Sequence, residues 1–139
     1  MALYDGAVLR AITQVALVIR QYDEAIAFFV EKLGFELLED KDMGNAKRWV
    51  RVSPPGNRGM ALLLARAVTE DEKRAVGHQS GGRVFLFLQT DDFAEDHRAL
   101  VARGVKFLEL PRHEIYGSVA VFEDLYGNRW DLLGPKPVL

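Results

Sequence analysis

The strongest constraint on the fold of this chain is an internal repeat of sequence patterns. In the first half, the apolar run AITQVALVI precedes DEAIAFFVEKLG, whose apolar residues have helical spacing and which ends at Gly34. In the second half, RVFLFLQT precedes DDFAEDHRALVARG, which ends at Gly104. Three further strand-like runs follow each helical pattern, and equivalent turns occur at Gly56-Asn57 and Gly127-Asn128. The repeat predicts two β-α-β-β-β modules of roughly 70 residues, each small for an independent hydrophobic core.

This repeat also sets the expected domain organisation. We expect one α+β domain over residues 1–139, with module one at about residues 8–67, a connector at about 68–81 and module two at about 82–135. Thr69 and Glu72 have the spacing of a capping box, which predicts a short helix in the connector. The alternative is a chance similarity between two α+β halves, and the coincidence of element order and turn positions argues against it.

Composition narrows the classes of partner and chemistry. The chain has 18 basic and 20 acidic residues, and it has no Lys/Arg block that would follow a phosphate backbone, so we expect no nucleic-acid partner. No apolar run approaches the roughly 18 residues of a membrane helix, and the first residues lack a signal-peptide pattern. These features predict a cytoplasmic protein that does not contact a membrane. The absence of cysteine excludes disulfides, thiolate metal sites and a Cys nucleophile.

One carboxylate stands out in a strand-like run near the end of the sequence. The stretch VAVFEDLYGNRWDLLG places Asp131 among apolar residues. A carboxylate that is buried without a partner is costly, so Asp131 should face solvent, a charged partner, a ligand or a metal. Arg129, two residues away on the same face of the strand, is one candidate partner.

The phrases IRQYDEAIAFFVEKLGF and FEDLYGNRWDLLG, together with the paired modules, resemble the vicinal oxygen chelate superfamily. This superfamily includes glyoxalase I, extradiol dioxygenases and bleomycin-resistance proteins, and the resemblance covers about residues 11–134. It implies that the two modules form paired half-barrel sheets around a cavity, and that the protein is a homodimer. It also implies a divalent metal, held by side chains from the first and last strand of each module, which would act as a Lewis acid.

The four metal-ligand positions of the family do not all carry a ligand in this sequence. The resemblance places them at Gln14, Ala61, Phe85 and Asp131. Only Gln14 and Asp131 have an oxygen to offer, whereas sites of this kind normally use three or more protein ligands. We therefore expect no strongly held metal and no other cofactor, with Gln14 and Asp131 as weak candidate ligands. Gln14 would otherwise make hydrogen bonds inside the cavity.

Several other residues are candidates for ligand binding. Phe85, Phe87 and Phe122 would line the pocket, with ordinary core packing as the alternative. Trp49 and Arg51 alternate with valines in KRWVRV, so they would face the cavity and bind a planar or anionic group, or else lie at a dimer interface.

The segment PRHEIYG supplies a second set of candidates between two strands of module two. Its members Arg112, Glu114 and Tyr116 would recognise a small polar ligand, with a solvated loop as the alternative.

Three functional hypotheses follow. The leading one is a protein of this superfamily that binds a small organic molecule in an apolar cavity without a strongly held metal. In a catalytic version of it, Asp131 or Glu114 would act as general base. The second is a metal-dependent glyoxalase-like lyase or isomerase, or a dioxygenase, and the third is a non-catalytic interaction module.

Overall fold

The first half of the chain forms a four-stranded sheet with one helical segment. The computed structural model describes residues 6, 8–56 and 59–135. Its first sheet has the strand order β1-β4-β3-β2, with the bounds β1 Gln14–Ile19, β2 Glu36–Gly44, β3 Lys47–Ser53 and β4 Ala61–Arg66. Between β1 and β2 the chain forms α1 Tyr22–Ile26, which continues as the π-helical segment η1 Ala27–Lys32. This is the predicted β-α-β-β-β order; Asn57 of the predicted Gly56-Asn57 turn lies outside the described residues.

The second half repeats this order with one additional strand. Its sheet has the order β5-β9-β8-β6, with β7 paired to β8, and the bounds β5 Val84–Gln89, β6 Lys106–Phe107, β7 Arg112–Glu114, β8 Gly117–Glu123 and β9 Arg129–Gly134. Helix α3 covers Phe93–Ala102. The predicted α+β class is confirmed, and neither sheet closes into a barrel.

Strand β7 corrects the expectation that the segment between β6 and β8 is a loop. Residues Arg112–Glu114 pair antiparallel with Gly117–Val119 of β8. The run VKFLEL, the first of the three strand-like runs expected after the second helix, forms only a short strand, because two of its residues pair with β8. The Glu109 side chain also bonds to β8, since its Oε2 accepts a hydrogen bond from the Val121 amide at 3.0 Å.

The predicted connector helix is present as α2, Glu70–Ala75. Thr69 Oγ1 accepts from the Glu72 amide at 3.1 Å, and Glu72 Oε1 accepts from the amides of Val68 and Thr69. These backbone hydrogen bonds lower the pKa of Glu72. The capping box read from the sequence is thus confirmed. No helix among the described residues is long and apolar enough to cross a membrane.

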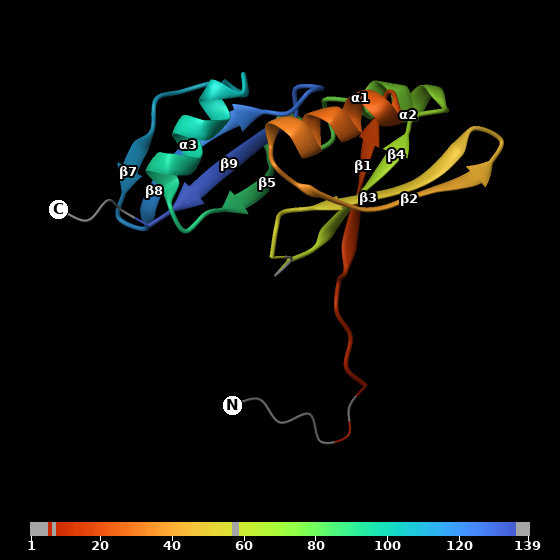
Figure 1. Cartoon of the computed structure of the whole chain (residues 1–139), viewed down its shortest axis with the longest axis horizontal. Helices are drawn as coiled ribbons and strands as arrows, with labels where there is room; N and C mark the ends of the chain where they lie inside the picture. The colour runs from red at the N-terminus through yellow and green to blue at the C-terminus, as the bar shows by residue number, and fades with distance from the viewer. Residues whose placement is uncertain (1–5, 7, 57–58, 136–139) are drawn as a thin grey trace.

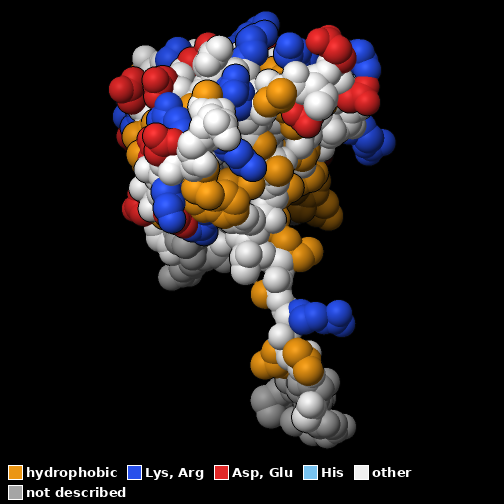
Figure 2. Space-filling model, turned by 90° about the vertical axis from the view of Figure 1, so that its right-hand side faces the viewer, with side chains coloured by type: hydrophobic (Ala, Val, Ile, Leu, Met, Phe, Trp, Pro, Cys, Tyr) orange, Lys and Arg blue, Asp and Glu red, His pale blue; other side chains and the backbone are white. Residues whose placement is uncertain are grey.

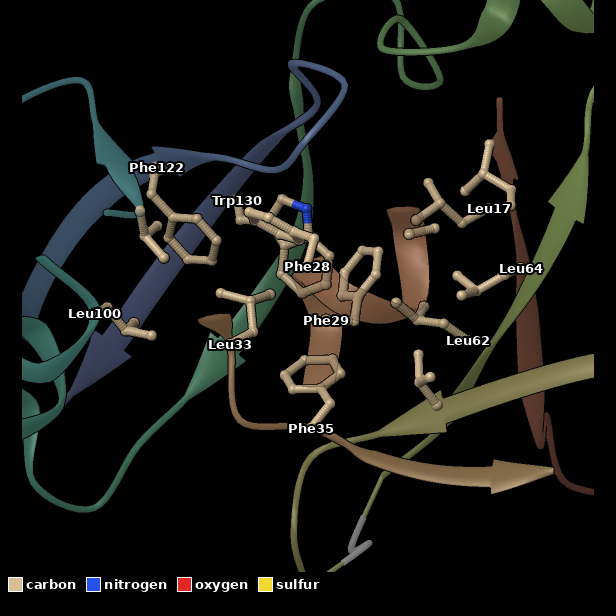
Figure 3. Close-up of a cluster of buried hydrophobic side chains, with 14 of the residues drawn as sticks. Leu17, Phe28, Phe29, Leu33, Phe35, Leu62, Leu64, Leu100, Phe122 and Trp130 are labelled. Carbon is tan, nitrogen blue, oxygen red and sulfur yellow. The ribbon is translucent and has the colours of Figure 1, made fainter. Parts of the chain in front are cut away.

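One buried cluster contains residues of both sheets (Figure 3). Phe29 of η1 packs against Phe35 and Trp130, with ring centroids 5.7 and 6.0 Å apart. Trp130 in turn stacks on Phe122 at 5.6 Å. Aromatic side chains from η1, the residue before β2, β8 and β9 therefore join the two halves through apolar contacts, which is consistent with modules too small to bury separate cores.

The two sheets lie side by side, with α1 and α3 on the same side of the molecule (Figure 1). Alternating residues of each strand point toward these helices and are buried, for example Val50, Val52 and Leu132. The intervening residues lie on what we call the open face of each sheet. On the first sheet the open face includes Gln14, Trp49 and Arg51, and on the second sheet it includes Phe87 and Asp131.

Candidate functional site

The open face of the first sheet carries a polar network centred on Arg51. Arg51 Nε donates to Gln14 Oε1 at 3.0 Å, and Arg51 Nη1 lies 2.5 Å from Glu39 Oε1. Trp49, on the same face of β3, is half-buried. The sequence therefore indicated correctly which face of β3 carries Trp49 and Arg51. It missed Glu39, whose position opposite Arg51 depends on the β2–β3 register.

Asp131 is the most unusual side chain on the open face of the second sheet. It lies in β9 between Phe87 of β5 and Val121 of β8. Its Oδ1 is buried and has no hydrogen-bond partner. Burial raises the pKa of Asp131, the charge of nearby Arg112 counteracts this effect, and Glu109 adds to it. Arg129 makes no ion pair with Asp131 in the described part of the chain, so the carboxylate retains a free acceptor.

Arg112 is held beside Asp131 by two other carboxylates. Its Nε donates to Glu109 Oε1 at 2.9 Å, and its Nη1 donates to Glu114 Oε1 at 2.8 Å. These two hydrogen bonds raise the pKa of Arg112 above its ordinary value. Glu114 is occupied by this ion pair, which makes it a weaker candidate for a general base than Asp131. Tyr116 lies at the β7–β8 turn and is 65% exposed.

The three candidate phenylalanines have different environments. Phe87 is opposite Asp131 in the β5–β9 ladder and is 63% exposed. Phe85 lies at a register shift between Val84 and Leu86 and packs against the core cluster. Phe122 is fully buried because it pairs with Trp130 on the helix side of the sheet. The expectation that Phe122 lines a ligand cavity is therefore wrong, and Phe87 is the aromatic residue placed beside Asp131.

We tested whether the residues present suit the divalent metal implied by the family resemblance. In the β1–β4 ladder Gln14 pairs with Ala61. In the β5–β9 ladder the register shift between Val84 and Leu86 places Phe87 opposite Asp131, so this ligand position falls on Phe87 and not, as expected from the sequence, on Phe85. Ala61 and Phe87 offer no ligand atom, and the amide oxygen of Gln14 already accepts from Arg51. Among the described residues no group of three His, Asp or Glu side chains is arranged to hold a metal ion. This donor set does not fit the family's metal.

Two surface hollows lie away from these residues. One of about 430 Å³ is lined by the β2–β3 hairpin, including Asp40, Asp42 and Arg48. Another of about 250 Å³ lies between the connector and the β8–β9 turn. Neither is lined by the open-face residues Gln14, Phe87 or Asp131. Neither of these two hollows lies between the two sheets, which are side by side in the chain (Figure 1).

Comparison with known proteins identifies the family. Residues 11–132 match the Glyoxalase/Bleomycin resistance protein/Dioxygenase superfamily. The chain therefore belongs to this superfamily, as the sequence resemblance implied.

Individual relatives agree with this assignment. An uncharacterized protein of Shewanella frigidimarina (strain NCIMB 400) is 54% identical over 125 residues, which are 89% of this chain and 93% of that protein. The crystal structure of UcmS2 is similar with a TM-score of 0.78 and 27% identity, covering 90% of this chain and 98% of UcmS2. TnmS3, an antibiotic binding protein from Streptomyces sp. CB03234, has a TM-score of 0.73 and 29% identity, covering 92% and 98%.

Proposed function

We propose that this protein binds a small organic molecule directly through side chains on the open faces of its sheets, without a strongly held metal. The observation that carries the proposal is the buried, unpaired Oδ1 of Asp131 next to the exposed ring of Phe87. Such a pair suits a flat molecule that stacks on the ring and donates an N–H or O–H hydrogen bond to the carboxylate. The similarity to the antibiotic binding protein TnmS3 supports binding of an organic ligand.

The chemistry of the ligand positions supports binding without a metal. The family's Lewis acid would need several oxygen or nitrogen donors, and two of the four positions are Ala61 and Phe87. The oxygen of Gln14 would have to give up its bond to Arg51 before it could bind an ion. A ligand that contacts Phe87 and Asp131 does not have to break the bond between Gln14 and Arg51.

We also propose that two copies associate to enclose the ligand. Residues 8–13, which we call the segment before β1, extend away from the body of the molecule and carry apolar side chains (Figures 1 and 2). Val8, Leu9 and Ile12 are 85%, 68% and 79% exposed. Apolar side chains this exposed favour a protein contact, and a second copy of the chain would cover them together with Phe87.

A second candidate function is acid–base catalysis on the bound molecule. Burial raises the pKa of Asp131, which is a common property of catalytic carboxylates. We place it second because no other described side chain is bonded to Asp131 to orient it for proton transfer.

The proposal is tested by a thermal-shift screen of aromatic compounds that carry an amine or hydroxyl group, followed by calorimetric titration of the hits. A ligand that binds only the folded state raises the melting temperature with its concentration. We expect hits to bind Phe87→Ala and Asp131→Asn about tenfold or more weakly, and to bind the control Ile115→Ala as tightly as wild type. Ile115 is 93% exposed and lies in the β7–β8 turn.

Two results would contradict the proposal. One is a set of hits whose affinities are unchanged in both Phe87→Ala and Asp131→Asn. The other is binding that EDTA abolishes and that zinc or nickel restores, because that result would favour a metal-dependent enzyme. A screen with no hits would instead favour an interaction module.

A further inference from the structure

The hollow between the connector and the β8–β9 turn is lined by charged residues that are not part of the proposed ligand site at Asp131 and Phe87. Its volume is about 250 Å³, and its lining includes Arg83, Arg129, His78 and Glu123. Val84 and Arg129 are cross-strand neighbours in the β5–β9 ladder, which places Arg83 and Arg129 at the same end of the sheet. Two arginines therefore line one small concave surface.

Neither arginine forms a salt bridge in the described part of the chain, although Glu123 lies opposite Arg129 in the β8–β9 ladder. Within the described residues, Arg83 and Arg129 have no carboxylate oxygen within 4.0 Å of their side-chain nitrogens. The acid in the hollow, Glu123, has its own cation, because its Oε2 lies 3.4 Å from Lys106 Nζ. In contrast, Arg48, Arg51 and Arg112 each bind two acceptor side chains. The hollow thus has a surplus of positive charge and unused guanidinium donors.

The walls of the hollow are held in place by contacts on both sides. The Gln79 amide donates to Asn128 Oδ1 at 3.0 Å, and the Gln79 side chain bonds to Ala16 O and Val18 N of β1 at 2.7 and 2.9 Å. Gly77 has φ +76, and a Cβ there would lie 2.0 Å from the carbonyl oxygen of Tyr126. The connector therefore packs against the turn at a distance that only glycine allows. Such a fixed surface would not need ordering before an ion bound.

We propose that this hollow binds a phosphate group. A guanidinium presents paired N–H donors whose spacing matches two oxygens of a phosphate, and two of them facing one hollow favour a dianion over a monoanion. The volume suits one phosphate group with water, and it is too small for a large organic ligand. This inference does not depend on the ligand proposed for Asp131 and Phe87.

The test is an NMR titration of the ¹⁵N-labelled protein with inorganic phosphate at constant ionic strength. A chain of 139 residues suits this method, and the amides of Gly77, Gly82 and Gly127 report on the hollow because these residues line it. We expect saturable shifts at these amides. Arg129→Gln and Arg83→Gln should each weaken binding about tenfold. Arg98→Gln is the matched control, since Arg98 is an exposed arginine of α3 that lies outside the hollow.

The outcomes separate the proposal from general attraction of anions. The proposal is supported if phosphate binding is weakened only in the Arg83 and Arg129 variants, and if acetate binds at least tenfold more weakly than phosphate. Shifts that do not saturate, an equal effect of Arg98→Gln, or equal affinity for acetate would overturn it. The spectra also show whether each variant is folded, so loss of binding is not confused with loss of structure.

Discussion

At the scale of single residues, Asp131 is a partly exposed carboxylate in an unfavourable environment. Its Oδ1 is buried without a partner, and burial raises its pKa. The folded state therefore binds the proton of this carboxyl group more tightly than the unfolded state does. The native structure tolerates this cost at neutral pH, which is typical of residues kept for binding or catalysis.

The first prediction concerns the stability of Asp131→Asn. Because the native pKa is raised, the ionised side chain destabilises the folded state at neutral pH, and this effect disappears as the pH falls below the ordinary value of 3.8. We expect the variant to be more stable than wild type by about 1 kcal/mol at pH 7, since partial exposure limits the gain. Urea unfolding at pH 7 and pH 3 measures the difference, and a less stable variant at pH 7 would contradict this interpretation.

A second prediction concerns the close contact at Gly77. Both Gly77 and Gly81 have positive φ, but only at Gly77 would a Cβ meet another part of the backbone. Gly77→Ala should therefore lower the free energy of unfolding by roughly 3 kcal/mol or more, whereas Gly81→Ala should cost only about 1–2 kcal/mol. Equal losses in chemical denaturation of the two variants would show that the connector does not pack on the Tyr126 carbonyl as described.

At the scale of elements, the connector joins the first strand to the last hairpin. Gln79 occupies the outer edge of β1 through bonds to Ala16 and Val18, while its amide bonds to Asn128. Asn128 belongs to a turn organised by Asp124, which accepts from the backbone amides of Tyr126 and Asn128 and from Trp130 Nε1. A single glutamine thus links elements from the two halves of the chain.

A third prediction follows for Gln79→Ala. Loss of the two side-chain hydrogen bonds to β1 should reduce stability by about 2 kcal/mol and speed hydrogen exchange at the Val18 amide. The control is Gln89→Ala, because Gln89 is an exposed glutamine of β5 with no hydrogen bond from its side chain in the described structure. Unchanged exchange at Val18 in the Gln79 variant would contradict the proposed link.

The sequence predicted most elements because local patterns determine them. Helical periodicity and terminal glycines predicted α1 and α3, and the Thr69–Glu72 spacing predicted the start of α2. Strand β7 was missed because three residues form it through pairing with β8, which no local pattern encodes. Phe122 was misplaced for a similar reason, since its side depends on the register with Trp130. Among the candidate site residues, Asp131 and Phe87 are adjacent in the structure. The positions of Glu39 and Glu109 could not be predicted because they depend on the tertiary structure.

At the scale of the whole molecule, the single chain leaves apolar surface uncovered. The segment before β1 and the ring of Phe87 are exposed although the chain has a continuous core. A second copy would bury both, and it would bring an additional open face to the candidate ligand site.

The fourth prediction tests this association. We expect sedimentation to give twice the chain mass of 15.6 kDa for the wild type. Ile12→Asp should shift the equilibrium toward monomer because it places a charge among exposed apolar side chains of the segment. Val101→Asp, at a half-exposed position on α3, should leave the mass unchanged. A monomeric wild type would contradict the proposed association.

The central proposal is that the side chains of this protein bind its ligand directly and that the protein does not bind a metal ion strongly. The most direct test is elemental analysis of protein purified without an affinity tag, before and after dialysis against zinc, nickel, iron and manganese. We expect the metal content to be far below one ion per chain in both samples, because Ala61 and Phe87 occupy ligand positions and Arg51 engages Gln14. A content near one ion per chain would contradict the claim and would favour glyoxalase- or dioxygenase-like chemistry.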